Sequence, residues 1–315
     1  MIKSPTFIRS LRRALVISSA ALMMLGALAV TSGCATGPGE RATGAAADVL
    51  LPPADEEKLG QELRRDVLKE VEVYDNDAIQ NYIDELGTKA VRAAGNKPKQ
   101  INYNFTVIKG DDLNAFAMPG GEIYVYTGLL EAMENEAELM GVLSHEVAHV
   151  SQRHIAQRLV ASYGLQALLS AALGNNPGVI SQLAGSVAAQ GYLLKYSRSH
   201  ESEADRYGLA YMARAGYDPQ GFISFFETMQ AQSGARMPEF MSSHPNPENR
   251  IAEARRIIAR MDNVPSETGQ QRYQQMMSGL DASESAPSRR RSPSSDEDDG
   301  DTDSDTDSGS RRRRR

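Results

Sequence analysis

Three of the five histidines in this 315-residue chain lie within residues 144–154, SHEVAHVSQRH. His145 and His149 are four positions apart, so on an α-helix both imidazole rings would point from one face toward a shared metal ion. Glu146 lies beside them, where it could take a proton from a water molecule that a zinc ion has acidified. This is the chemistry of a metallopeptidase. His154 is nine residues from His145, near the opposite side of such a helix, and is expected to be a surface or packing residue.

A catalytic zinc ion needs a third protein ligand and an open coordination position. The segment SRSHESEADRYG, residues 197–208, offers Glu201 and Asp205, again four positions apart on one helix face. Glu201 could complete a His₂Glu site, and Asp205 could accept a ring N–H from a zinc-bound histidine. His200 and Glu203 are close enough to ligate instead. Acidic residues at a helix start also favour the helix dipole without any metal, so spacing alone leaves these alternatives open.

The rest of the chain predicts the elements that would position these residues. Asn135, followed by Glu138, predicts the start of a helix that carries HEVAH and runs to about residue 160. Apolar periodicity and turn residues predict helices over 54–73, 76–94, 203–215 and 219–233 and one that begins at Asn246 or Pro247. Alternation predicts a strand over 101–109 and two extended pieces around the Pro-Gly-Gly turn of residues 114–128.

Residues 159–194 contain no charged side chain and are split by GNNPG at 174–178. Each half is shorter than the roughly 20 residues that a helix needs to span a bilayer. A buried or lid-like helical hairpin accounts for this pattern. An apolar flap that touches a membrane or an unfolded substrate accounts for it as well.

The N-terminus predicts export from the cytoplasm. A basic segment, MIKSPTFIRSLRR, precedes an uncharged apolar run over residues 14–30 and then TSGC. We interpret residues 1–33 as a signal peptide and Cys34, the only cysteine, as the lipidation site of a lipoprotein. An uncleaved membrane anchor is the alternative. Ala35 favours the outer membrane, by resemblance to lipoprotein sorting rules. The protein is therefore expected in the cell envelope, facing the periplasm and held to the membrane through Cys34.

Composition separates a globular part from two flanking segments. The chain is 41% hydrophobic and 24% charged, as globular proteins are, and its net charge of −7 gives no reason to expect nucleic acid as a partner. We expect a tether over residues 34–53, a metallopeptidase domain over 54–262 and a C-terminal extension over 263–281. Residues 282–315 have almost no apolar side chains and predict a disordered charged tail. Weak calcium binding or attraction to anionic polymers are alternative roles for this tail.

Four motifs in order resemble one protein family. HEVAH, the downstream ESEAD, NAFAMPGGEIYVYTGLL at 114–130 and SSHPNPENRIAEA at 242–254 resemble the zinc metallopeptidases that include HtpX and the CAAX prenyl proteases. The resemblance covers residues from about 55 to 260 and is strongest to the soluble, lipid-anchored periplasmic branch. It implies an α+β fold that is mainly helical and zincin-like, with a small β-sheet whose edge strand lines the active-site cleft. It also implies one Zn²⁺ per chain, with Glu201 as the third ligand.

The resemblance assigns further roles. His244 is expected to approach the metal and stabilise the oxyanion, and Arg250 to pair with an acidic residue such as Asp205. A turn histidine and a helix-surface arginine are the alternatives. The extended residues expected to bind substrate main chain by strand addition, unless they form a plain internal strand, are Asn114, Ala115, Phe116, Ala117 and Met118.

The expected partners are unfolded or misfolded proteins and, by resemblance, the outer-membrane assembly machinery. The expected function is cleavage of misfolded or unassembled envelope proteins, which is protein quality control. The alternative is a periplasmic chaperone or assembly factor with a latent zinc site, in which His244 ligates the metal and displaces the water.

Overall fold

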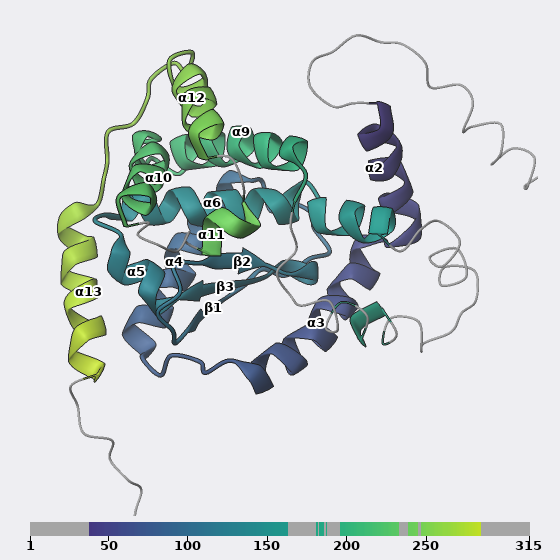
Figure 1. The fold of residues 1–315 in the computed structure, drawn as a ribbon, viewed down its shortest axis with the longest axis horizontal. Coiled ribbons are helices and arrows are strands. Elements are labelled where there is room, and N and C mark those ends of the chain that lie inside the picture. Colours follow the sequence, from purple (N-terminus) through teal and green to yellow (C-terminus); the bar gives the residue numbers. More distant parts are fainter. Residues whose placement is uncertain are drawn as a thin grey trace, which may run out of the picture.

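The structure, a computed structural model, is mainly helical with one small sheet (Figure 1). It describes residues 38–162, 181, 183–185, 187, 196–232, 239–244 and 247–284. The expected signal peptide, Cys34, most of the uncharged stretch 159–194 and the tail after residue 284 lie outside these residues. Within the described part of the chain, no helix is both long enough and apolar enough to cross a bilayer. The expected α+β fold with a small sheet is confirmed.

Within the described residues, three strands form a mixed sheet in the order β1-β3-β2. β1 (Asn104–Ile108) runs parallel to β3 (Glu122–Tyr126), and β2 (Ala115–Ala117) runs antiparallel to β3 as an edge strand. The turn Pro119–Gly121 joins β2 to β3, as its sequence predicted. Gly120 has φ 77°, and a Cβ there would lie 3.0 Å from the Cα of Gly60 in α3 (Pro53–Glu70). Both the left-handed backbone and the close approach of α3 therefore require glycine.

The central helix, α6 (Glu136–Ser151), is buried from its first residue to Val150. The Asn135 side chain accepts the Glu138 N–H at 3.1 Å, and the Glu138 carboxylate accepts the Glu134 N–H at 3.0 Å. This capping confirms the predicted helix start. A helix buried on all sides needs neighbours on all sides. They are β2, α4 (Asp77–Ala93), α9 (Arg198–Arg214) and α10 (Gln220–Gln232).

The helix that carries HEVAH ends earlier than predicted. It stops at Ser151, and Arg153 has a left-handed φ of 59° before a second helical stretch at 154–162. The expectation of one helix to about residue 160 was therefore wrong. The break also moves His154, which does not lie on the far side of the helix but is fully buried next to His149.

Helix α9 approaches α6 closely, and Figure 1 shows the two side by side with α6 toward the sheet. A Cβ at Gly208 would lie 3.3 Å from the His145 backbone, so the glycine permits this approach. The Ser197 hydroxyl accepts the His200 N–H at 3.1 Å and caps α9, which begins before the predicted residue 203. The early start places Glu201 and Asp205 on the helix that faces His145.

Two further helices complete the surroundings of α6 and β2. α12 (Pro247–Ile258) packs on α9 and α10. The short helix α11 (Glu239–Ser243) lies at the outer edge of β2, where the Phe240 N–H donates to the Leu113 carbonyl at 3.2 Å. α11 therefore lies beside the segment that leads into β2.

Helices at both ends of the described chain pack on this centre. Residues expected to form a tether contain α2 (Pro38–Leu50), and Ala47, Leu50 and Leu51 are buried. α13 (Gln270–Glu284) packs on α4 and α5 (Thr127–Ala132), and the Tyr273 hydroxyl donates to the Leu130 carbonyl at 2.5 Å. Chain on both sides of the expected domain therefore adds to its core.

Candidate active site

Four side chains converge between α6, α9 and the residue that follows α11. His145, His149, Glu201 and His244 are all buried, and one ligand atom of each lies within 4.8 Å of the others. His145 Nε2 is 3.0 Å from His149 Nε2 and 3.2 Å from His244 Nδ1. Glu201 Oε1 is 3.1 Å from His244 Nδ1 and 3.5 Å from His149 Nε2. The structure thus brings together the three predicted ligands and adds His244 as a fourth donor.

The arrangement of these atoms fits a tetrahedral metal ion such as zinc. With ligand bonds of about 2.0–2.1 Å, tetrahedral ligand atoms lie roughly 3.3 Å apart. The distances between His145, His149 and Glu201, and from His244 to His145 and Glu201, are 3.0 to 3.5 Å and are close to that separation, and all four donors lie within 4.8 Å of one another. Imidazole nitrogens and a carboxylate are also the donor set that zinc takes in proteins.

Asp205 and Arg250 fix the outer nitrogen of His145. Asp205 Oδ1 lies 3.1 Å from His145 Nδ1, so a ring N–H there would leave Nε2 free to face the cluster. Arg250 donates to both oxygens of Asp205, at 2.5 and 2.8 Å, and its other terminal nitrogen is 2.9 Å from Glu201. The expected pairing of Arg250 with Asp205 is present in the structure.

Burial and neighbouring charges set different protonation states for the donors. Burial lowers the pKa of His149 well below its usual value, so this ring is neutral and ready to ligate. Burial would raise the pKa of Glu201, but the charges of His244 and Arg250 hold it well below the usual range. Burial and Arg250 would lower the pKa of His145, yet hydrogen bonds with Asp205 and Glu201 raise it to about 9. Metal binding must therefore displace a proton from His145.

Glu146 links the metal-donor cluster to the sheet. Its Oε2 accepts the Ala117 N–H from β2 at 2.9 Å. Its Oε1 is buried without a hydrogen-bond partner among the described residues, and His244 Nε2 is 3.5 Å away. Burial raises the pKa of Glu146, although His244 and His145 oppose the rise. A carboxylate with a raised pKa and a free oxygen can accept a proton from a reacting group.

The expected substrate-binding segment is the buried edge strand beside Glu146. The main-chain groups of Asn114, Phe116 and Met118 face β3. The Asn114 carbonyl accepts the Tyr126 N–H, and the Met118 N–H donates to the Glu122 carbonyl. Ala115 and Ala117 alternate with them, so their main-chain groups face the outer edge. The Asn114 amide is buried, and neither its oxygen nor its nitrogen has a partner in the described part of the chain.

Two residues near the metal donors were not recognised from the sequence. The Tyr196 ring stacks on His149 with centroids 3.7 Å apart, and no motif pointed to it. His154 lies 3.0 Å from His149, nitrogen to nitrogen, and Glu203 contacts His154. His200 and Glu203, the alternative ligands, do not belong to the four-donor cluster.

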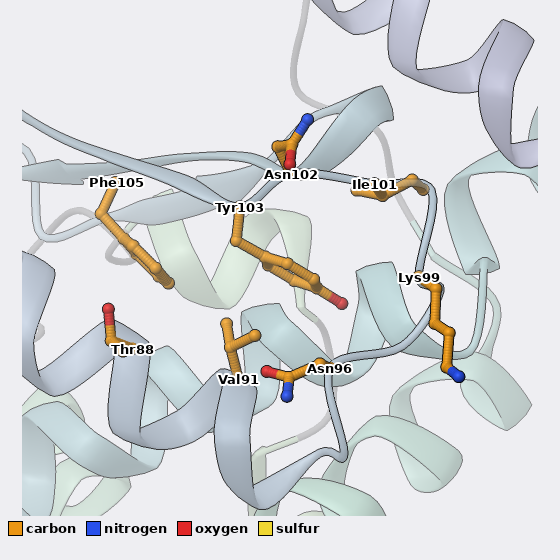
Figure 2. Close-up of a pocket in the computed structure, with 8 residues that line it drawn as sticks. All are labelled: Thr88, Val91, Asn96, Lys99, Ile101, Asn102, Tyr103 and Phe105. Atoms are coloured by element: carbon orange, nitrogen blue, oxygen red, sulfur yellow. The ribbon is translucent and has the colours of Figure 1, made fainter.

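A cavity of about 290 Å³ lies elsewhere, between the end of α4 and the segment that leads into β1 (Figure 2). Its lining is formed by Thr88, Val91, Asn96, Lys99, Ile101, Asn102, Tyr103 and Phe105. None of these residues belongs to the metal-donor cluster, so this cavity is separate from the active site.

A His-Glu-x-x-His helix with a third acidic donor from a second helix defines a metallopeptidase centre. The chain belongs to peptidase family M48, whose sequence model matches residues 77–258. This match confirms the resemblance drawn from the motifs.

Relatives of known name agree with the family. The beta-barrel assembly-enhancing protease of Escherichia coli K12 is 30% identical over 261 residues, which are 78% of this chain and 52% of that protein. Metalloprotease YcaL of the same organism is 36% identical over 175 residues, 54% of this chain and 68% of that protein. Mitochondrial metalloendopeptidase OMA1 of Arabidopsis thaliana is 32% identical over 182 residues, 58% of this chain and 36% of that protein. The chain spans about half the length of the beta-barrel assembly-enhancing proteases that it matches.

Proposed function

We propose that this protein is a zinc-dependent endopeptidase of the cell envelope that hydrolyses misfolded or unassembled envelope proteins. The observation that carries the proposal is the position of Glu146, whose unpartnered Oε1 lies in the same buried site as the four metal donors. His145, His149 and Glu201 would hold zinc, which when bound supplies Lewis acidity toward water and the peptide carbonyl.

The residues around the proposed metal site have different roles in peptide hydrolysis. Glu146 takes the proton from the attacking water at Oε1 and passes it to the nitrogen of the leaving amine. The Ala117 N–H holds Oε2 and so keeps Oε1 directed into the site. Asp205 and Arg250 keep His145 in one orientation. In this assignment Asp205 and Arg250 pair with each other, Glu201 would ligate the metal, and Glu146 has a catalytic role.

The edge strand supports a substrate bound through its main chain. Ala115 and Ala117 present main-chain groups at the outer edge of β2, and Ala117 also contacts the proposed general base. A peptide added as a further strand would lie beside Glu146. Recognition of main chain suits an enzyme that accepts unfolded chains of many sequences.

The site of action follows from the N-terminal sequence and the relatives. A signal peptide followed by Cys34 supports a lipid anchor, and Ala35 supports the outer membrane. The name of the Escherichia coli relative links that protease to beta-barrel assembly. We infer that the present protein faces the periplasm and acts on proteins destined for the same membrane, alongside its assembly machinery.

One observation favours a second candidate, a chaperone or assembly factor with a latent site. His244 Nδ1 joins the cluster while Nε2 points toward Glu146, so the ring occupies the space between them. Four protein donors leave no open position, as in structural zinc sites. The contact of α11 with Leu113, just before β2, would further limit the access of a peptide to the site. Displacement of α11 and His244 would be needed before a peptide could enter.

The decisive experiment measures metal content and proteolysis on one sample. The full-length protein, purified in detergent, is assayed for zinc per chain and for cleavage of casein, next to Glu146→Gln. We expect one zinc per chain in both proteins and a loss of cleavage of about 10²–10⁴-fold in the variant. Zinc without cleavage in either protein, together with suppression of client aggregation by both, would favour the chaperone. Absence of zinc from both would overturn the metal site itself.

A further inference from the structure

Each metal-ligating histidine on α6 has its second ring nitrogen occupied, but by different means. His145 Nδ1 contacts the carboxylate of Asp205 directly, at 3.1 Å. Among the described residues, His149 Nδ1 contacts no carboxylate; it lies 3.0 Å from Nδ1 of His154. The other nitrogen of His154, Nε2, is 3.4 Å from Glu203 Oε2. His154 thus stands between a metal donor and a carboxylate, with both of its ring nitrogens engaged.

The metal site fixes which group donates and which accepts in the hydrogen bonds from His149 to His154 and from His154 to Glu203. If His149 ligates through Nε2, its Nδ1 carries the proton and must donate. His154 Nδ1 must then accept, so the proton of neutral His154 lies on Nε2 and is donated to Glu203. We propose that His154, held by Glu203, is a positioning residue that fixes the tautomer and the ring orientation of His149 for metal binding. The inference rests on the proposed metal site.

The break after α6 is what places His154 there. On a continuous helix, residues five apart point about 140° away from each other, and the two rings could not meet. The left-handed φ of Arg153 turns the chain back and brings His154 against His149. A non-glycine residue in this region is strained, so the surrounding contacts must hold it.

The Arg153 side chain supplies those contacts. Its guanidinium donates to Glu56 Oε2 at 3.0 and 3.1 Å, to Asp48 Oδ1 at 2.6 Å and to the Leu51 carbonyl. Burial raises the pKa of Glu56, although the charge of Arg153 opposes that rise. The N-terminal helices α2 and α3 therefore hold the turn that presents His154.

Packing around His154 permits a test that separates hydrogen bonding from shape. His154 is buried and stacks on His200, with centroids 4.5 Å apart and planes at 11°. His154→Phe keeps a flat ring in this stack but removes the acceptor for His149. His154→Asn loses the ring, yet its side-chain carbonyl can accept near the position of Nδ1. A purely structural residue would tolerate phenylalanine better than asparagine, whereas a positioning residue would show the reverse order.

The readout is zinc affinity, measured on the full-length protein by competition with a chromophoric chelator. We expect His154→Phe to weaken zinc binding by about 10–100-fold, the usual effect of losing an outer partner of a ligand. His154→Asn should recover most of the affinity, although it should melt earlier in the metal-free state. The visible spectrum of the Co²⁺-loaded protein should change for His154→Phe and change less for His154→Asn.

Variants at the far end of the contact give a second test. Glu203→Leu removes the acceptor for His154 and should weaken zinc binding by a smaller factor, about 3–10-fold. Arg206→Ala is the matched control. The exposed Arg206 side chain lies 3.4 Å from Glu203 Oε1, whereas His154 contacts Oε2 of the same carboxylate. Arg206→Ala should bind zinc as the unmodified protein does.

Unchanged zinc affinity in His154→Phe, or weaker binding by His154→Asn than by His154→Phe, would overturn the inference. If the unmodified protein binds zinc and cleaves casein while His154→Phe retains full affinity, only the positioning role fails. If the unmodified protein binds no zinc, the proposed function fails with it.

Discussion

Two pairs of buried residues on opposite sides of the metal-donor cluster, Asp205 with Arg250 and Glu146 with Asn114, differ in how completely they are hydrogen-bonded. On the side of α9 and α12, Asp205 contacts His145 and two nitrogens of Arg250. On the side of β2 and α11, Glu146 Oε1 and the whole amide of Asn114 are buried without a hydrogen-bond partner among the described residues, and His244 Nε2 is 3.5 Å from Glu146 Oε1. Both sides are equally buried, so exposure to solvent does not explain the difference.

This difference indicates that one side stabilises the structure and that the other side binds a ligand. A buried polar group without a partner costs about 1–3 kcal/mol, so such groups are rare where nothing binds. The paired side holds the metal donors in place. The unpaired side borders the strand edge, where a peptide main chain could supply the missing donors and acceptors. Four predictions, from the largest effect to the smallest, test this division.

The largest effect is expected on the paired side. Arg250→Met would leave Asp205 buried and uncompensated, and we expect the free energy of unfolding to fall by about 3–5 kcal/mol. Urea unfolding with a chelator present measures this without a contribution from metal. Arg255→Met is the control on the same helix, because Arg255 pairs with Glu227 at 2.7 Å but is exposed, and it should cost less than about 1 kcal/mol. Equal costs for both variants would remove the distinction between the sides.

The next effect concerns the cover of the unpaired side. His244→Ala should open a coordination position and raise casein cleavage by roughly tenfold or more, if the open state holds a tenth or less of the molecules. Ser242→Ala, on the same short helix, should not change the rate. A fall of about 10²–10³-fold in His244→Ala would instead support the oxyanion role expected from the sequence.

A smaller effect is expected at the unpartnered amide. Asn114→Ala should change the free energy of unfolding by less than about 1 kcal/mol, since no hydrogen bond within the described residues is lost, while KM rises by about 2–10-fold. Asn135→Ala is the matched comparison, because its side chain caps α6 at 3.1 Å. It should cost about 1 kcal/mol in stability without a change in KM. The opposite pattern would show that Asn114 is a structural residue.

The smallest effect is expected at an exposed pair outside both sides. Arg272 donates to Glu85 at 2.6 and 3.0 Å, and with Lys89 it lowers the pKa of Glu85 from 4.5 to about 2. A lowered pKa stabilises the fold above pH 4.5, and this contribution is lost as the pH falls toward 2. Because both side chains are more than 40% exposed, Glu85→Gln should cost less than about 1 kcal/mol at pH 7. The difference between variant and unmodified protein should vanish near pH 2; a difference that persists there would contradict this account.

The sequence predicted what depends on local spacing. The pairs His145–His149 and Glu201–Asp205 are four residues apart, so a helix alone places each pair on one face. The start of α6 and the turn between β2 and β3 were also predictable, because Asn135 and Gly120 act on their own neighbours. The family resemblance led to His244 and Arg250, which spacing could not relate to the metal.

The sequence did not predict what depends on distant partners. The end of α6 is set by Arg153, whose guanidinium reaches Asp48 and Glu56, about a hundred residues earlier. From the sequence, which does not show those contacts, a continuous helix is the better expectation. On such a helix His154 would point away from His149. The helical state of α2 has the same origin, since its buried residues need the folded domain as a partner.

The packing of α2 limits how far a lipid on Cys34 could hold the domain from a bilayer. Residues 35–37 alone separate that cysteine from Pro38, the first residue of the helix. Four extended steps reach at most about 14 Å. A flexible chain of 20 residues would average roughly 25 Å between its ends and let the domain swing. If Cys34 carries a lipid, the short connection and the contact of Asp48 with Arg153 would fix the orientation of the domain relative to a bilayer, and with it the height of the metal-donor cluster above the lipid.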